Sequence, residues 1–151
     1  MPDTIQTYHG SYLMPSLARA TVVDAMHPGM LSCQADAPLS EVARLMATHR
    51  VHCIVIMSIA HGDYGERLAW GIISDLDLLR AGVRNGRDTT AGSLAQQPII
   101  SVNPSTPLRE AGELMLAHGV THLVVIEPDT QRPVGILSTL DVAGVLAWEE
   151  R

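Results

Sequence analysis

Apolar residues recur along this chain with two alternating periods. One is the spacing i, i+3, i+4, i+7 of a helix face, which occurs at Leu39, Val42, Ala43 and Met46 and again at Leu108, Ala111, Gly112 and Met115. A proline precedes each stretch, as is common in the first turn of a helix. Two amphipathic helices are therefore predicted, and Thr106 is a better N-cap for the second than Ala37 is for the first.

Short β-branched runs follow both predicted helices. The runs HCIVIM at 52–57 and HLVVIE at 122–127 are too brief for helices and predict buried strands. After polar loops that contain glycine or proline, LAWGIIS at 68–74 and PVGILS at 133–138 are expected to be their hairpin partners. Helical patterns then return at 75–83 and 139–148.

These elements form an internal repeat. Residues 30–57 align with residues 99–126 at a constant offset of 69, and nine of the 28 positions are identical. The stretch GIISDLD at 71–77 recurs as GILSTLD at 135–141, where the offset falls to 64 because the first copy has a longer loop. A helical turn that opens on threonine is expected before each aligned stretch, and each stretch begins with a brief strand. The predicted unit is helix turn, strand, helix, strand, strand, helix.

The expected fold class is α/β, of the α+β type, with two pseudo-symmetric units packed through their sheets. The predicted boundaries are an N-terminal arm at 1–20, a first domain at 21–84, a linker at 85–90 and a second domain at 91–149. Hydrophobic residues make up 46% of the chain and aromatic residues 3%, so the core is expected to be aliphatic and rich in methionine. A sixty-residue unit buries a modest core alone, and a shared interface with paired clefts is therefore expected.

Charge narrows the function classes. The formal net charge is −6, all ten basic residues are arginine, and no basic stripe is present, so nucleic acid is an unlikely partner. The absence of lysine excludes a Schiff base on a side chain and a phosphate loop of the G-x-x-x-x-G-K type. No nucleophile elbow or H-E-x-x-H motif occurs, and no catalytic residue is predicted.

The two cysteines, Cys33 and Cys53, have no spacing typical of a disulfide framework, which favours a reducing compartment. No signal peptide and no apolar run long enough to span a bilayer is visible. The expected location is the cytoplasm, without membrane association.

The repeated motif has two interpretations. Ser74-x-x-Asp77 and Ser138-x-x-Asp141 are each typical of a capping box, in which the serine caps a helix and the acidic residue bonds back. The alternative is a ligand site, because Gly71 and Gly135 occupy the same point of an apolar strand, where glycine weakens pairing unless a backbone or a ligand comes close.

The residue types of the motif suit one kind of ligand. A helix N-terminus and a serine hydroxyl favour an anion such as phosphate at Ser74 or Ser138. An ionised aspartate only accepts hydrogen bonds, so Asp77 or Asp141 favours two hydroxyl donors such as a ribose diol. Together these groups indicate the sugar-phosphate end of a nucleotide.

The region 21–148 resembles a tandem pair of CBS domains (cystathionine β-synthase domains), whose units close with G-h-x-[S/T]-x-x-D, and both copies match. The resemblance implies a sensing module that binds AMP, ADP, ATP or S-adenosylmethionine, requires no cofactor and catalyses nothing. It assigns ribose hydroxyls to Asp77 and Asp141 and phosphate to Ser74 and Ser138. It also implies an unidentified regulated partner protein and a homodimer formed through helices.

A second resemblance covers the stretch THRVHCIVI. In the regulatory γ subunit of AMP-activated kinase, a similar stretch carries a histidine-arginine pair that approaches phosphate. The corresponding pairs here are His52-Cys53 and Thr121-His122, which lack the arginine. The resemblance therefore implies phosphate contacts at His52, Thr121 and His122.

Three arginines are candidates for the missing charge: Arg80, Arg84 and Arg87. The last two are also explained as solvated linker charges. Gly144 replaces Arg80 in the second copy, and Asp75 becomes Thr139. An added carboxylate disfavours anions unless Arg80 offsets it, so the two motifs are predicted to share a ligand class but not an affinity.

The first strand of each unit lies where the family holds adenine between apolar side chains and backbone. Position alone makes adenine candidates of Met30, Ser32, Ile99, Ser101 and Cys53, with core packing as the alternative.

Two function classes stay open. One is the adenosine-nucleotide sensor. The other is a structural or interaction protein, in which the paired units dimerise or dock a partner and the clefts are weak or empty. Metal binding at His49, His52, His118 and His122 is less favoured, because no structural-zinc spacing exists.

Overall fold

The computed structural model describes residues 15–84, 88–95 and 99–148, without the side chains of 59–62 and 66–68. The chain divides into two compact units. One comprises Met30–Ile99, and the other comprises the chain up to Gly29 together with Ile100 onward. Most of the predicted arm at 1–20, including Tyr8 and Tyr12, and also Arg87 lie outside the described residues.

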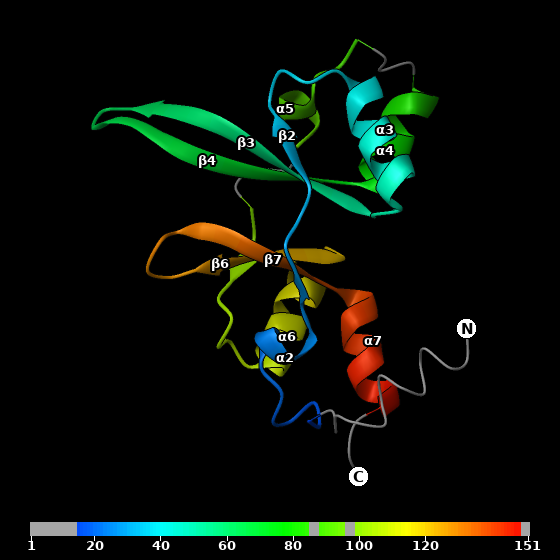
Figure 1. Ribbon diagram of the computed structural model, residues 1–151, viewed down its shortest axis with the longest axis vertical. Coiled ribbons are helices and arrows are strands. Elements are labelled where there is room, and N and C mark those ends of the chain that lie inside the picture. Colours follow the sequence, from blue (N-terminus) through cyan, green and yellow to red (C-terminus); the bar gives the residue numbers. More distant parts are fainter. Residues whose placement is uncertain (1–14, 85–87, 96–98, 149–151) are drawn as a thin grey trace. The chain divides into compact units, whose positions relative to one another are not determined.

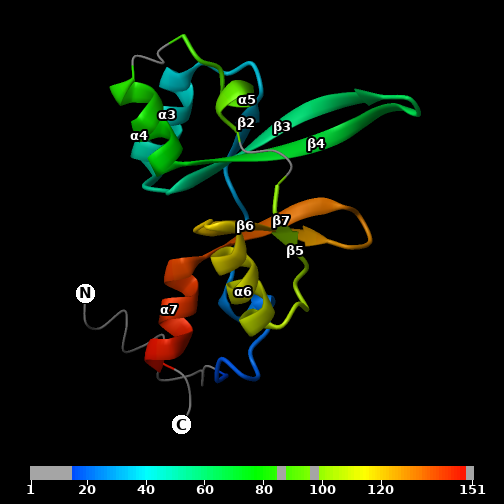
Figure 2. The same cartoon turned by 180° about the vertical axis from the view of Figure 1, so that it is seen from behind.

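The Met30–Ile99 unit contains a three-stranded sheet of order β2-β3-β4, in which β2 and β3 are parallel and β3 and β4 antiparallel. Figures 1 and 2 show α3 and α4 side by side over one face of this sheet. Its elements are β2 (Ser32–Gln34), α3 (Leu39–His49), β3 (Cys53–Gly62), β4 (Gly65–Ser74), α4 (Asp75–Val83) and α5 (Ala91–Leu94).

The other unit contains a four-stranded sheet of order β1-β7-β6-β5, in which only the β5–β6 pair is parallel. The helices α6 and α7 pack against it, with α2 beside them (Figure 1). Its elements are α2 (Val22–Ala25), β1 (His27–Pro28), β5 (Ser101–Val102), α6 (Leu108–His118), β6 (His122–Glu127), β7 (Arg132–Ser138) and α7 (Thr139–Trp148). The predicted α+β class is thereby confirmed.

Each unit has its own aliphatic core. The strand residues Ile54, Ile56 and Ile73 are fully buried in the first, and Val42 and Met46 pack on them from α3. The corresponding core of the other unit contains Leu108, Met115, Leu123, Val125 and Leu137. The helical periodicity seen in the sequence therefore marks the buried faces of α3 and α6.

The segment that leads into each repeat folds onto the other repeat. Thr21 forms a bridge with Pro107, and Thr90 forms the equivalent bridge with Pro38. The backbone N–H of Leu108 donates to the carbonyl of Ala20 over 2.9 Å, as that of Leu39 does to Thr89 over 3.2 Å. The helices α2 and α5 therefore belong to the compact unit formed by the repeat that they do not precede.

This exchange also caps α3 and α6. Their N-caps are Pro38 and Pro107, neither of which provides a side-chain cap, and the first N–H of each helix donates to one of these exchanged carbonyls instead. The prediction of Thr106 as N-cap is wrong, because its hydroxyl accepts from the N–H of Asn103 over 3.2 Å.

The longer loop predicted in the first repeat is instead a longer hairpin. Strands β3 and β4 stay in register as far as Gly62 and Gly65, so the chain reverses at Asp63 and Tyr64. Gly65 has a φ of 102°, which a residue with a side chain rarely adopts. The glycines that suggested a loop therefore belong to a tight turn at the end of a ribbon that projects from its sheet (Figure 2).

Candidate functional site

The first motif forms the start of α4. Ser74 is the N-cap, its Oγ accepts from the N–H of Asp77 over 3.2 Å, and its own N–H donates to Asp77 Oδ2 over 2.9 Å. The capping-box interpretation is therefore confirmed for this motif. The carboxylate is held against the helix start with 12% of its side chain exposed.

The second motif repeats this geometry at α7. The N–H of Ser138 donates to Asp141 Oδ2 over 2.8 Å, and the N–H of Asp141 donates to Ser138 Oγ over 3.2 Å. A serine hydroxyl that accepts a bond keeps its own proton for donation. Each motif thus places one serine hydroxyl and one carboxylate within a turn of each other, which is compatible with the ligand chemistry predicted from the sequence.

Strand register brings the predicted phosphate residues to the two motifs. Cys53 pairs with Ser74 across β3 and β4, and His122 pairs with Ser138 across β6 and β7. The carbonyl of His52 accepts from the N–H of Asp75, and that of Thr121 accepts from Thr139.

The backbone hydrogen bonds that Asp75 and Thr139 donate to His52 and Thr121 reduce the anion-binding capacity predicted for the starts of α4 and α7. At each helix, one N–H of the first turn donates to the carbonyl of the residue just before a strand, and another donates to the motif serine. Phosphate binding there depends on the serine hydroxyl and neighbouring side chains more than on bare backbone donors.

The two helix starts differ in their charged neighbours. His52 Nδ1 lies 2.9 Å from Asp75 Oδ2, and both side chains are more than half exposed. Arg80 NH1 lies 3.8 Å from Asp77 Oδ1. Asp75 therefore has an ion-pair partner, His52, that the sequence did not indicate. In the second motif, where threonine replaces Asp75, Thr121 Oγ1 contacts His122 Nδ1 over 2.9 Å.

His27 is a functional candidate that the sequence did not indicate. Its Nδ1 lies 2.7 Å from Asp141 Oδ1, and the Asp141 side chain is only 5% exposed. Because the capping bond uses Oδ2, both oxygens of this carboxylate have partners within the unit. The two residues are more than a hundred positions apart, and only the pairing of β1 with β7 reveals the contact.

The same pairing explains Gly135. A Cβ at this position would lie 2.5 Å from the carbonyl oxygen of His27 and 3.3 Å from Met26 Sδ. The close approach inferred from the sequence is therefore made by the chain's own backbone, and Gly135 does not require a ligand. Its counterpart Gly71 is buried and pairs with Ile56.

The adenine candidates are less well assembled than the motif residues. Ser32 pairs with Val55, so β3 separates it from β4; Ser101 pairs with Val124, so β6 separates it from β7. With about 4.8 Å between strands, each serine is roughly 10 Å from its motif strand. Met30 and Ile99 are half-buried residues at the ends of their unit. Only Cys53 lies beside a motif residue.

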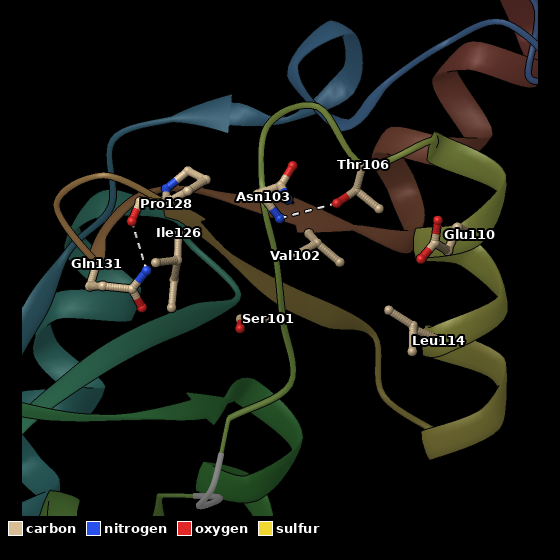
Figure 3. Close-up of a pocket in the computed structure, with 9 residues that line it drawn as sticks. All are labelled: Ser101, Val102, Asn103, Thr106, Glu110, Leu114, Ile126, Pro128 and Gln131. Carbon is tan, nitrogen blue, oxygen red and sulfur yellow. Dashed lines mark hydrogen bonds between the residues drawn. The ribbon is translucent and has the colours of Figure 1, made fainter.

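Each unit also contains a cavity. A cavity of about 320 Å³ lies between α6, β5 and the β6–β7 turn, and Figure 3 shows Glu110 and Leu114 reaching toward it from the helix. The charged residue in its lining is the acidic Glu110, which disfavours an anion. A second cavity, of about 270 Å³, adjoins the first motif and is lined by Asp77, Arg80, Ala81, Arg84, Thr89 and Leu94.

The described residues show no group of three or more histidine, cysteine or acidic side chains arranged to hold a metal ion. Cys33 and Cys53 do not form a disulfide. Burial raises the pKa of the Cys33 thiol, and the nearby carboxylate of Glu41 adds to the effect. This buried thiol is therefore poorly suited to act as a nucleophile.

Comparison with known proteins identifies the family. The CBS domain model matches residues 22–84 and 91–147, and the chain therefore belongs to the CBS domain family. It is 25% identical over 126 residues to the CBS domain-containing protein YhcV of Bacillus subtilis (strain 168), covering 82% of this chain and 84% of that protein. Two motif copies and the tandem arrangement predicted from the sequence are thereby confirmed.

Solved structures show the same fold. The CBS domain protein PAE2072 from Pyrobaculum aerophilum, complexed with AMP, is 27% identical, and the match covers 85% of this chain and 96% of that one with a TM-score of 0.70. Hypoxic Response Protein I, solved with two coordinated zinc ions, is 28% identical, with 83% and 98% covered and a TM-score of 0.65.

Among the described residues, no helix combines the length and the apolar character needed to cross a membrane.

Proposed function

We propose that this protein is a regulatory module that binds an adenosine compound at its two repeated motifs and acts on a partner protein without catalysing a reaction. The observation that carries the proposal is the pair of matching helix starts, each with a mostly buried carboxylate and a serine hydroxyl. The AMP held by the similar protein PAE2072 supports the same ligand class.

In this proposal Asp77 and Asp141 accept ribose hydroxyls, because an ionised carboxylate matches two vicinal donors. Ser74 and Ser138 donate to the 5′-phosphate, together with the neighbouring His52, Thr121 and His122. Arg80, in the last turn of α4, is a candidate for a phosphate contact on the other side of Asp77. The ligand is AMP, ADP, ATP or S-adenosylmethionine, and no further cofactor is required. Met30, Ser32, Ile99, Ser101 and Cys53 are the candidates for contacts with adenine, and the cytoplasm is the proposed location.

The proposed assembly is a homodimer through the last helix of each unit. α4 exposes Leu76, Leu79 and Val83 at the spacing i, i+3, i+7, and α7 exposes Leu140, Leu146 and Trp148. Exposed apolar stripes of this kind mark association surfaces. We expect the variant Leu79→Glu to shift the mass measured by light scattering toward the monomer. An unchanged mass would show that α4 does not form the interface.

Isothermal titration calorimetry with AMP, ADP, ATP and S-adenosylmethionine tests the ligand. We expect at least one of these to bind the wild type, and Asp77→Asn with Asp141→Asn to abolish binding. The matched control is Glu110→Gln, which neutralises an acidic residue in the other cavity. Undiminished binding after both motif changes would refute the assigned carboxylates, and the absence of binding by all four ligands would refute the sensor.

The second candidate is a structural or interaction protein with weak or empty clefts. One observation favours it: the capping bonds and His27 together engage both oxygens of Asp141. A dimer that forms normally but binds no adenosine compound would support this candidate. The metal alternative retains one support, the zinc ions of Hypoxic Response Protein I.

A further inference from the structure

The cavity beside the first motif has features that the proposed binding of AMP does not explain. Its wall is lined by the side chain of Asp77 and by two arginines, Arg80 and Arg84, which lie further along the chain at and beyond the C-terminal turn of α4. The apolar side chains of Ala81 and Leu94 and the hydroxyl-bearing Thr89 complete the lining. A cavity lined by two arginines favours an anion, and arginine in particular favours phosphate because its planar fork bonds two oxygens at once.

The direction of the cavity distinguishes it from the site proposed for the 5′-phosphate. Ser74 and His52 lie at or before the N-terminus of α4, whereas Arg80 and Arg84 follow Asp77 by three and seven residues. With a rise of about 1.5 Å per residue, these positions are roughly 4.5 and 10 Å further along the helix direction. A ribose on Asp77 that directs its 5′ end toward Ser74 therefore directs its 2′,3′ edge toward the arginines.

The size of the cavity limits what it can hold. Sites that enclose a whole small ligand usually occupy about 300–1,000 Å³. At about 270 Å³ this cavity lies just below that range, and it has ample room for a phosphate substituent of a nucleotide. Because Asp77 of the first motif also lines it, we treat the cavity as a subsite of that motif.

The second repeat does not provide the same chemistry. At the offset of 64 that relates the two motifs, Gly144 replaces Arg80 and Trp148 replaces Arg84. The carboxylate of Asp141 contacts His27 at 2.7 Å, whereas Asp77 has Arg80 NH1 at 3.8 Å. An anion beside the ribose is thus favoured in the first repeat only.

We propose that the first motif selects an adenosine ligand that carries a second phosphate, on the 2′ or the 3′ hydroxyl, and that Arg80 and Arg84 bind this phosphate. The remaining free hydroxyl donates to Asp77, whose negative charge the two guanidinium groups offset. Dinucleotide-binding proteins use the same principle when an arginine beside the ribose position accepts a 2′-phosphate. This inference rests on the proposed binding of the ribose at Asp77.

Calorimetric titrations with AMP, adenosine 2′,5′-bisphosphate and adenosine 3′,5′-bisphosphate test the subsite and distinguish its two phosphate positions. We expect one bisphosphate to bind the wild type about tenfold more tightly than AMP, since a charge-assisted contact of this strength corresponds to about that factor. The gain should shrink as salt is raised, because the arginine side chains are exposed.

Three variants assign the gain to the cavity. Arg80→Gln and Arg84→Gln, separately and together, should remove the preference for the bisphosphate. Arg84→Gln should leave the affinity for AMP within about threefold, because Arg84 is not among the contacts proposed for AMP. Arg44→Gln is the matched control, because Arg44 is an exposed arginine of α3 in the same unit and does not line the cavity. Thermal unfolding of each variant near the wild-type temperature confirms that the fold is retained.

The outcomes separate this inference from the proposed function. Binding of AMP with no gain from either bisphosphate, or a gain that survives loss of both arginines, overturns the subsite and leaves the sensor standing. A gain lost in the double variant and kept in Arg44→Gln supports the subsite. Failure of all three compounds to bind overturns the subsite, and the sensor is overturned as well only when ADP, ATP and S-adenosylmethionine also fail to bind.

Discussion

Replacing Gly135 by alanine is expected to destabilise the unit that contains the second motif. Gly135 pairs with Pro28 where β1 joins the sheet, and the added Cβ would lie 2.5 Å from the carbonyl oxygen of His27. The obstructing atom belongs to the backbone, so a side-chain rotation cannot relieve the contact. To reach an ordinary separation of about 3.4 Å, β1 must move away from β7 by most of an ångström.

The cost has two parts. Over-packing of this kind typically costs about 1–3 kcal/mol. The movement also weakens the backbone bonds of β1, including that from the N–H of Gly29 to Val134 over 3.0 Å, each contributing about 1 kcal/mol. The total of roughly 2–4 kcal/mol corresponds to a fall in melting temperature of about 5–15 °C for a chain of this size.

Differential scanning calorimetry of Gly135→Ala and Gly144→Ala measures the effect against a matched control. Gly144 lies within α7, where an added Cβ meets nothing within 4 Å. Alanine there should raise the melting temperature by a few degrees, because glycine costs about 1 kcal/mol in a helix. Equal melting temperatures for the two variants would refute the steric explanation of the motif glycine.

Three smaller effects are expected. Ser138→Ala should lower the free energy of unfolding by about 1 kcal/mol through loss of the cap, measured by urea denaturation, and no loss would contradict the capping box. His27→Ala should cost about 1–2 kcal/mol, because its carboxylate partner is nearly buried, whereas His52→Ala, in an exposed pair, should cost under about 0.5 kcal/mol; reversal of this order would disprove the assigned contacts. Finally, the raised pKa of Cys33 means that the folded protein holds the thiol proton more tightly than the unfolded chain. Stability should therefore fall as pH rises above the ordinary thiol pKa, and a Cys33→Ala variant should lack that fall in urea titrations across alkaline pH.

Sequence periodicity predicted the regular elements well where local signals agree. The helices at 75–83 and 139–148 were predicted with their observed bounds, because a capping box defines each start. The paired strands were predicted from β-branched runs with limits that differ by a few residues. The main error was the β3–β4 hairpin, where glycine and polar residues indicated a loop but occur in a regular antiparallel ribbon.

Candidate-site residues close in sequence were predicted better than distant ones. Ser74 and Asp77 are one turn apart, so their contact follows from helix geometry alone. The contact of His27 with Asp141 depends on β1 pairing with β7, and no local pattern encodes that pairing. The same limit applies to Gly135. The sequence correctly indicated that something approaches this glycine closely, but it favoured a ligand, whereas the neighbour is the backbone of His27.

The exchanged leading segments also affect how this chain can fold during synthesis. Thr21 pairs with Pro107, more than eighty residues later, and the N–H of Leu108 needs the carbonyl of Ala20. Contacts between residues so distant in sequence slow folding, because a long loop must close before they stabilise anything. The segment around Thr21 therefore cannot reach its final contacts until α6 has been synthesised. At 5–20 residues per second, this delay is on the order of five to twenty seconds. During that interval the apolar side chain of Val22, fully buried in the finished protein, is exposed to solvent or to a chaperone.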